Sequence, residues 1–248
     1  MSLSVQIESA AYRKKVVLEQ ISFAAESGTV TAVIGRNGSG KSTLVACLCS
    51  LMPFHGRVIC DGVDLAALSG RERAQMRSAV LQSLNAPHVT VRELVSFGRA
   101  PYRALGRSLS SSDLEKIDRA LQTADLVSLQ NCYTDCISGG ELRRAYLGAV
   151  IAQDTDTVIL DEATAFMDAD YQHRFLQTVC SLAKEEKKTV ISVMHDLGAA
   201  VRYADNILLL DRGRQLFFGS VAELLATDLI ERTFGVRRFT TDGRIFFA

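Results

Sequence analysis

The chain is 248 residues long and 48% hydrophobic, enough to bury a sizeable core without disulfide or metal cross-links. Lysine plus arginine and aspartate plus glutamate each number 28, so no net field favours nucleic acid or an anionic membrane surface. The first residues lack a basic-then-apolar signal pattern, and no run of about 18 apolar residues occurs. We expect a soluble protein with no nucleic-acid partner.

The cysteines are scattered along the chain. Cys47 and Cys49 lie two apart in a predicted helix and therefore face different directions, and Cys132 and Cys136 have no second ligand pair nearby. The pattern favours reduced, mostly buried thiols over a disulfide framework or a metal site. The six positions are Cys47, Cys49, Cys60, Cys132, Cys136 and Cys180.

The N-terminal part predicts three strands. Residues 2–8 alternate apolar and polar, residues 16–25 repeat the pattern, and residues 30–34 are almost wholly apolar, as in a buried parallel strand. Tyr12 lies between the first two strands. From the residues alone, stacking on an adenine and simple packing are equally open interpretations of this tyrosine.

A glycine-rich loop follows the third strand and leads into a helix. Glycines let the backbone curl so that successive N–H groups point into one concavity, which suits a polyphosphate, and the helix N-terminus adds unpaired donors. Lys41 can reach the β- and γ-phosphates, and the Ser42 hydroxyl can ligate Mg²⁺. The residues expected to bind nucleotide here are Gly35, Asn37, Gly38, Ser39, Gly40, Lys41, Ser42 and Thr43.

A short strand and a helix separate this loop from the next apolar strand. Residues 56–62 predict the strand, and Ser69 with Glu72 forms a capping box for a helix that continues to about residue 77. Residues 79–81 predict a strand that ends at Gln82. A side chain in that place points at the crevice where ligands of open α/β sheets bind.

No strand pattern occurs between residues 90 and 153, which predicts an inserted helical lobe. Helical spacing begins after Thr90. Ser112 and Glu115 predict the cap of a second helix that ends near Ala124. A last helix covers residues 141–153. We therefore expect one domain over 1–248, with a core of 1–89 and 154–248.

Strands and helices alternate after the lobe, which implies a mostly parallel sheet covered on both faces. A hairpin, a helical tail and a terminal hairpin turning at Asp242-Gly243 follow. The predicted strands are 157–160, 189–193 and 206–210; the helices are 169–184 and 197–203; the first hairpin turns at 212–215, and the tail covers 220–234.

Three polar residues follow two of these apolar strands at the same sheet edge. Asp161 is placed to hold Mg²⁺ opposite Ser42, and Glu162 is placed to polarise an attacking water. An N-cap pair for the next helix is the alternative for these two carboxylates. His195 is placed to hydrogen-bond a γ-phosphate, the alternative being a structural histidine.

A second candidate anion site opens the last helix of the lobe. Ser138 and Glu141 form a capping box, but Gly139 and Gly140 directly after the cap are poor helix starters, costing roughly 1 kcal/mol each against alanine. They leave backbone N–H groups exposed at a helix N-terminus. Two phosphate-binding helix ends in one chain are explained if each serves a different nucleotide.

With these motifs in order, nearly the whole chain resembles the ATP-binding cassette ATPases, whose fold is a P-loop NTPase sheet with an N-terminal antiparallel portion. Residues 35–43 match the family's Walker A loop, and 158–162 match Walker B. Residues 138–141 match its signature. The resemblance implies ATP and Mg²⁺ as cofactors, catalytic roles for Lys41, Gln82, Glu162, Asp168 and His195, an adenine-stacking role for Tyr12, nucleotide contacts from Ser138, Gly139, Gly140 and Glu141, and magnesium contacts from Ser42, Gln82 and Asp161.

The resemblance also implies partners. Members of the family pack head to tail, so that one signature closes over ATP held by the other subunit. Residues 90–94, 98–102 and 104–107 look like the ATPase subunits of bacterial iron–siderophore, haem and cobalamin importers. This likeness implies integral-membrane permease subunits, indirectly a periplasmic or lipid-anchored substrate-binding protein, and a peripheral place on the cytoplasmic face of the cell membrane.

The chain departs from the family pattern at three places. Ala163 replaces the usual proline, Ala165-Phe166-Met167 replaces Ser-Ala-Leu, and Ile137 replaces leucine. None removes a catalytic group, so we expect hydrolysis to be retained. The competing hypothesis is a soluble cassette ATPase of DNA repair or translation; the short separation of Lys41 from Ser138, the single cassette and the zero net charge argue against it.

Overall fold

The computed structural model describes every residue except Met1, Lys14, 104–107, Phe166 and 242–243. The strands are β1 Ser2–Tyr12, β2 Lys15–Glu26, β3 Val30–Ile34, β4 Phe54–Cys60, β5 Val63–Asp64, β6 Arg77–Val80, β7 Thr157–Asp161, β8 Thr189–Val193, β9 Asn206–Asp211, β10 Arg214–Ser220, β11 Arg238–Thr241 and β12 Arg244–Phe247. The helices are α1 Lys41–Leu48, α2 Gly70–Met76, α3 Val91–Ser96, α4 Ser111–Thr123, α5 Gly139–Gln153, α6 Ala169–Lys184, α7 Leu197–Tyr203, α8 Val221–Leu225 and α9 Leu229–Phe234, with 3₁₀ turns η1 Leu65–Ala67, η2 Phe97–Tyr102, η3 Val127–Leu129 and η4 Thr134–Cys136.

One ten-stranded sheet runs in the order β5-β4-β1-β2-β10-β9-β3-β8-β7-β6. Strands β9, β3, β8, β7 and β6 are parallel neighbours, in a register that pairs Val190 of β8 with Val30 and Val158. Strands β5, β4, β1 and β2 are antiparallel, as predicted for the N-terminal portion. Strand β10 joins the two parts, antiparallel to β9 and parallel to β2.

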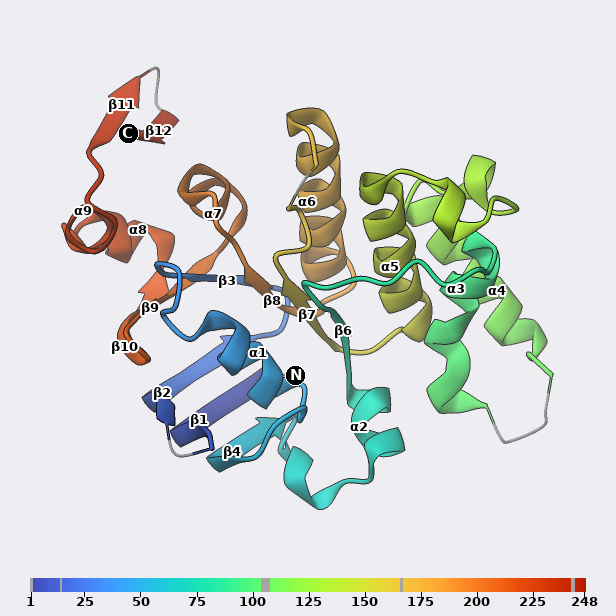
Figure 1. Cartoon of the computed structure of the whole chain (residues 1–248), viewed down its shortest axis with the longest axis horizontal. Helices are drawn as coiled ribbons and strands as arrows, with labels where there is room; N and C mark the ends of the chain where they lie inside the picture. Colours follow the sequence, from blue (N-terminus) through green and yellow to red (C-terminus); the bar gives the residue numbers. More distant parts are fainter. Residues whose placement is uncertain (1, 14, 104–107, 166, 242–243) are drawn as a thin grey trace.

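Helix α1 lies between the antiparallel strands and the parallel strands (Figure 1). Its buried Leu44, Val45 and Leu48 pack in one cluster with side chains of both parts of the sheet, among them Leu18 of β2 and Ile191 of β8. The phosphate loop that precedes α1 is therefore anchored from two sides by apolar contacts.

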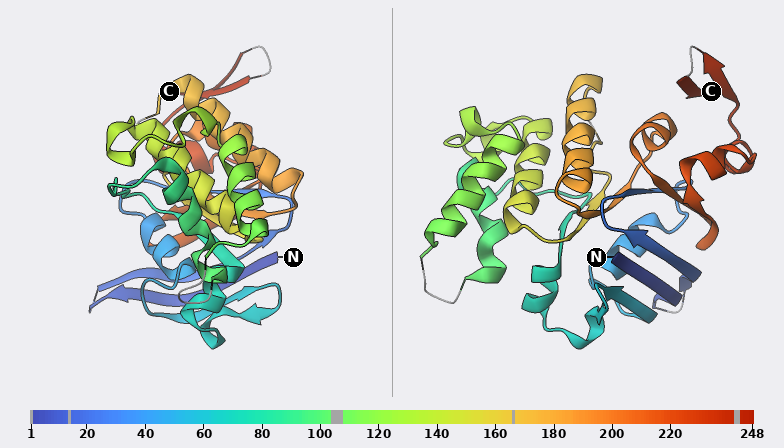
Figure 2. Two further views of the ribbon diagram at one scale, coloured as in Figure 1. Left: turned by 90° about the vertical axis from the view of Figure 1, so that its right-hand side faces the viewer. Right: turned by 180° about the vertical axis from the view of Figure 1, so that it is seen from behind.

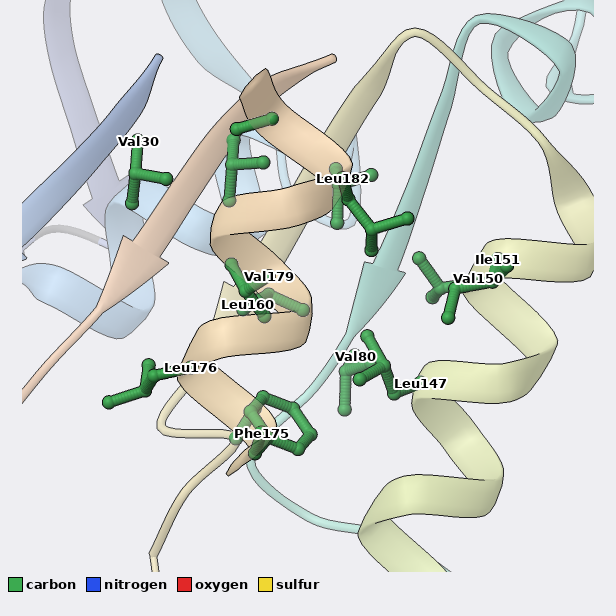
Figure 3. Packing of buried hydrophobic residues seen from close by; sticks show 14 of the residues in the cluster. Val30, Val80, Leu147, Val150, Ile151, Leu160, Phe175, Leu176, Val179 and Leu182 are labelled. Atoms are coloured by element: carbon green, nitrogen blue, oxygen red, sulfur yellow. The ribbon is translucent and has the colours of Figure 1, made fainter. Parts of the chain in front are cut away.

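The opposite face of the parallel strands is covered by α5 and α6 (Figure 3). Phe175, Leu176, Val179 and Leu182 follow the 3.6-residue period of α6, and all are buried. Figure 3 shows these side chains facing those of Leu160 and the sheet, with α5 beside them. The prediction of a parallel sheet with helices on both faces is confirmed.

Helices α3, α4 and α5 gather at one end of the molecule (Figure 2). Arg99 of the turn η2, which follows α3, links α4 and α5: its Nε donates to Asp113 Oδ1 at 2.8 Å in a buried ion pair, and its Nη1 donates to the carbonyl of Ala152 at 2.8 Å. Hydrogen bonds from Arg99 and Ser110 lower the pKa of Asp113 to about 2. The division of the chain into this lobe and a core stays a prediction.

Several predicted boundaries are wrong. The cap of α4 is Ser110, with Asp113 at the third helical position, and not Ser112 with Glu115. The reason is that Asp113 also pairs with Arg99, so the earlier start satisfies both groups. Helix α2 ends one residue before Arg77, which begins β6.

The cysteines are less buried than expected. Only Cys47 and Cys60 are buried, whereas Cys136 is exposed. Among the residues that the structure describes, no helix combines the length and apolarity needed to cross a membrane.

The C-terminal segments follow the predicted order. Strands β9 and β10 form the predicted hairpin, and β11 pairs with β12 at the edge of the molecule (Figure 1). The predicted turn at 242–243 lies outside the described residues.

A substitution of Asp113 tests the contribution of the Arg99–Asp113 ion pair to the stability of the lobe. Asp113→Ala leaves a buried guanidinium without its carboxylate and should lower the free energy of unfolding by about 3 kcal/mol in urea titrations. The matched control is Asp118→Ala, because Asp118 pairs with Arg92 on the surface and such pairs contribute under about 1 kcal/mol. Equal effects of the two substitutions would contradict the assignment.

Candidate nucleotide and catalytic site

A cavity of about 510 Å³ opens at the carboxyl ends of the parallel strands. Parallel pairing brings the segments after β3, β6, β7 and β8 to one edge although they are distant in sequence. The cavity is lined by Val17, Asn37, Gly38, Gly40, Lys41, Ser42, Thr43, Gln82, Glu162 and His195.

The loop before α1 adopts a conformation that requires glycine. Gly38 and Gly40 have φ of +78° and +103°, and a Cβ on Gly40 would lie 2.5 Å from Cδ2 of Leu18. Gly40 provides no side-chain cap for α1. The first N–H groups of the helix are therefore left for a ligand at the cavity.

Lys41 is held inside the loop. Its Nζ donates to the carbonyls of Gly35 at 2.7 Å and Arg36 at 3.1 Å, and the residue is only 5% exposed. Burial lowers the pKa of this amine, while the charges of Glu162 and Asp161 act in the opposite direction. A polyphosphate in the cavity would offer the ammonium a charged partner in place of two neutral carbonyls.

Glu162 is held by two side chains and has an unusual backbone conformation. Its Oε2 accepts a hydrogen bond from Gln82 Nε2 at 2.6 Å, and its Oε1 lies 2.6 Å from His195 Nε2, within ion-pair distance. The side chain is 10% exposed, and the residue has φ of +51°, a left-handed conformation that is strained for glutamate. The carboxylate is thus held at the cavity wall by two side chains from the segments that follow β6 and β8.

Asp161 ends β7 and is 5% exposed. Burial, followed by the charge of Glu162, raises the pKa of Asp161 to about 6. Its Oδ1 is buried and has no hydrogen-bond partner among the described residues. This unpartnered carboxylate oxygen and the Ser42 hydroxyl in the first turn of α1 are oxygen ligands of the kind that a hard divalent cation prefers.

The N-cap alternative for the acidic pair is wrong. Helix α6 begins at Ala169, and its cap is Asp168, whose Oδ1 accepts from the N–H of Tyr171 at 3.0 Å. Asp168 does not line the cavity. Asp161 and Glu162 precede Asp168 in the chain, so neither of them caps α6.

The signature residues lie outside the cavity of their own chain. Ser138 accepts from the N–H of Glu141, and Glu141 Oε2 accepts from the N–H of Ser138, so the capping box is confirmed. The space next to Gly139 is open. Tyr12 also stays apart; it is 54% exposed and does not line the cavity, whereas Val17 of the next strand does.

Two contributors to the site were missed by the sequence analysis. Val17 forms part of the cavity wall, and Arg143 Nη1 donates to the carbonyl of Glu162 at 3.4 Å. A valine in a strand of alternating apolar and polar residues gives no sequence signal that it lines a cavity. Arg143 could have been found from its position five residues after Ser138, on the helix that the signature opens.

Fold and site together are those of an ATP-binding cassette, and the comparisons agree. The family model described as "ABC transporter" matches residues 18–165, and the chain belongs to this family of ATP-hydrolysing transporter subunits.

Curated relatives match over almost the whole chain. It is 35% identical to the ferric enterobactin transport ATP-binding protein FepC of Escherichia coli, over 94% of this chain and 87% of the relative. It is 32% identical to the siderophore transport ATP-binding protein YusV of Bacillus subtilis, covering 99% and 90%. It is 39% identical to the hemin import ATP-binding protein HmuV of Nocardia farcinica, covering 88% and 75%.

Solved structures share the fold. A metal-chelate type ABC transporter in an inward-facing conformation matches with a TM-score of 0.83 at 24% identity, covering 99% of this chain and 95% of that one. The ADP-bound ATP-binding cassette of another ABC transporter matches with a TM-score of 0.82 at 20% identity, covering 94% and 98%.

Asp161→Asn tests the burial of that carboxyl. Because the pKa of Asp161 is raised above its ordinary value of 3.8 to about 6, the folded state binds more protons in this window, and stability falls as pH rises through it. Asparagine cannot ionise, so the free energy of unfolding of the variant should exceed that of the wild type by about 3 kcal/mol at pH 8 and by little at pH 4. Urea titrations with chelator and no nucleotide measure this; a less stable variant at pH 8 would contradict it.

Proposed function

We propose that this protein is the ATP-hydrolysing subunit of a bacterial importer of iron–siderophore chelates, working with a separate permease. The observation that carries the proposal is the Glu162 carboxylate, held by Gln82 and His195 in the wall of a cavity whose other side is the glycine loop. A carboxylate fixed opposite a phosphate-binding loop suits hydrolysis of a nucleoside triphosphate.

Glu162 acts as the general base. One of its carboxylate oxygens accepts a proton from a water molecule as the water oxygen bonds to the γ-phosphorus. The bond from that phosphorus to the β–γ bridging oxygen breaks, and ADP leaves with the electron pair. Lys41 and the N–H groups of the loop stabilise the charge on the phosphates, and His195 hydrogen-bonds the γ-phosphate while it orients Glu162.

Magnesium fits the donor set of the site. Asp161 with its unpartnered oxygen, Ser42 and Gln82 would hold the ion, which neutralises charge on the β- and γ-phosphates when bound. The remaining members of the loop, Gly35, Asn37, Gly38, Ser39, Gly40 and Thr43, contact the phosphates. Tyr12 stacks on the adenine.

A second copy of the chain completes the site. Ser138, Gly139, Gly140 and Glu141 lie outside the cavity of their own chain, yet they present open backbone at the start of α5. In a head-to-tail homodimer these residues close over ATP bound to the partner subunit. Asp168, in the loop before α6, contributes to the same interface.

The names of the relatives support a choice of cargo. FepC and YusV carry enterobactin and siderophore transport in their names, which supports an iron–siderophore chelate. Import of such a chelate would involve a polytopic permease and, indirectly, a substrate-binding protein. The subunit then acts at the cytoplasmic face of the membrane. Haem is the second candidate cargo, since the hemin import relative has the higher identity over a shorter match.

Glu162→Gln separates binding from hydrolysis. The amide keeps the hydrogen-bonding shape of the side chain but cannot accept the proton, so turnover should fall about 10²–10⁴-fold while ATP binding persists. Size-exclusion chromatography with ATP should show a trapped dimer. The matched control is Glu185→Gln on the exposed end of α6; wild-type turnover in Glu162→Gln would remove Glu162 from the role of base.

A pull-down tests the import function. Tagged Glu162→Gln, mixed with ATP and the source cell's detergent-solubilised membranes, should capture a polytopic permease and its binding protein, read by mass spectrometry. The binding protein's ligand then distinguishes a siderophore from haem. Ribosomal or DNA-associated partners would instead support the soluble alternative in translation or DNA repair.

A further inference from the structure

Arg77 is a buried arginine with few partners. It begins β6 and is 7% exposed. Its Nη2 donates to Ser50 Oγ at 2.9 Å, whereas its Nη1 is buried and has no hydrogen-bond partner among the described residues. A guanidinium has five N–H donors and is charged at every physiological pH, so one neutral hydroxyl does not satisfy it.

No carboxylate compensates this charge. Within the described part of the chain, no ion pair includes Arg77, and the groups that act on it electrostatically are Cys49, Arg73 and Cys60. Burial raises the pKa of Cys49 to about 11, so this thiol is neutral at pH 7. Of the groups that act on Arg77, the one charged at pH 7 is therefore Arg73, a like charge, which also lacks an ion pair within the described residues.

Both arginines line one cavity of about 230 Å³ between the end of α1, helix α2 and the start of β6, which we call the Arg73–Arg77 cavity. Ser50, which accepts the hydrogen bond from Arg77 Nη2, also lines this cavity. The guanidinium group of Arg77 therefore lies at the cavity, and not only the aliphatic part of its side chain. None of the lining residues is acidic. The full lining is Cys49, Ser50, Gly70, Arg73, Ala74, Arg77, Ser78 and Ala79.

The Arg73–Arg77 cavity is separate from the nucleotide cavity. It shares no lining residue with that cavity, and its lining includes residues of α2 and the first residues of β6; Figure 1 shows α2 at the amino end of β6. The nucleotide cavity lies at the carboxyl ends of the strands. A neighbouring cavity of about 360 Å³ shares Ser50 and Arg73 and adds Arg57 and Asp64, whose charges are opposite.

Burying a charge without a partner costs several kcal/mol, and a second like charge beside it adds to that cost. An anion in the cavity would remove both penalties. Arginine binds carboxylate and phosphate through paired N–H groups. Two unpaired guanidinium groups at one small cavity match the charge of a phosphate dianion better than that of a single carboxylate.

We propose that the Arg73–Arg77 cavity binds a phosphate dianion, supplied either as free inorganic phosphate or as the phosphomonoester headgroup of a lipid. The shared chemistry is the tetrahedral PO₄ group held by the two guanidinium groups and the Ser50 hydroxyl. The site is independent of the proposed ATPase cycle, because it uses none of the residues assigned to that cycle.

Isothermal titration calorimetry with inorganic phosphate tests the site. The measurements use Lys41→Ala protein, in which the loop before α1 is weakened as a competing site, with and without Arg77→Leu. We expect Arg77→Leu to weaken phosphate binding at least tenfold. Arg77→Leu should also fold at least as stably as its parent in phosphate-free buffer, since it removes a buried unpaired charge. Arg73→Leu repeats the test should Arg77→Leu fail to fold.

Arg71→Leu is the matched control. Arg71 is on the same helix, but its Nε and Nη2 donate to the carbonyls of Pro101 and Arg103 outside the cavity. This variant should bind phosphate as its parent does. Absence of phosphate binding, or equal affinities with and without Arg77, would overturn the proposal unless the lipid test below is positive.

Flotation with phosphatidylcholine vesicles, with and without phosphatidic acid, distinguishes the two sources. Flotation that requires both phosphatidic acid and Arg77 assigns the site to a lipid headgroup. Calorimetric binding without such flotation assigns it to free phosphate. If neither assay depends on Arg77, the cavity is not an anion site and the proposal is wrong.

Discussion

The parallel register of β3, β8, β7 and β6 is the constraint on which the rest of the structure depends. Each strand is short and buried, and the pairing fixes where each one ends. Lys41, Gln82, Glu162 and His195 follow the strands at that edge. A shift of one strand by a residue would turn its side chains to the other face and would separate Glu162 from Gln82 and His195.

Several polar groups in this structure are buried at a cost in stability. Glu162 sits in a strained backbone conformation, Asp161 keeps an oxygen without a partner, and Lys41 is bonded to neutral carbonyls. Strain and unsatisfied groups of this kind gather at functional sites because the ligand supplies the missing interactions. The apolar clusters on both sides of the sheet provide the stability that tolerates them.

The buried arginines of this protein differ in how well their charge is satisfied. Arg99 is buried like Arg77, but it has Asp113 and two carbonyls as partners and therefore holds the helical lobe together. Arg77 has one hydroxyl. A buried charge whose donors are satisfied, such as Arg99, has a structural role, whereas a buried charge with unsatisfied donors, such as Arg77, can bind a ligand.

Local patterns predicted much of the fold and of the site. The glycine loop, the acidic pair and His195 were recognised from motif and spacing, and the wall of the cavity contains most of them. Capping boxes at Ser69 and Ser138 were also predicted. These features depend on residues a few positions apart, so a short stretch of sequence is sufficient to define them.

Other features depend on partners distant in sequence, and only the tertiary structure decided them. Helix α4 is capped by Ser110 and not by the predicted Ser112, because Asp113 pairs with Arg99. Val17 joined the cavity wall because β2 packs against the loop. The sequence holds equal numbers of basic and acidic residues, so it could not show that Arg77 lacks an ion-pair partner among the described residues. Sequence determined which groups are present and which strand ends carry them; folding decided which groups meet, because burial and pairing are properties of the packed chain.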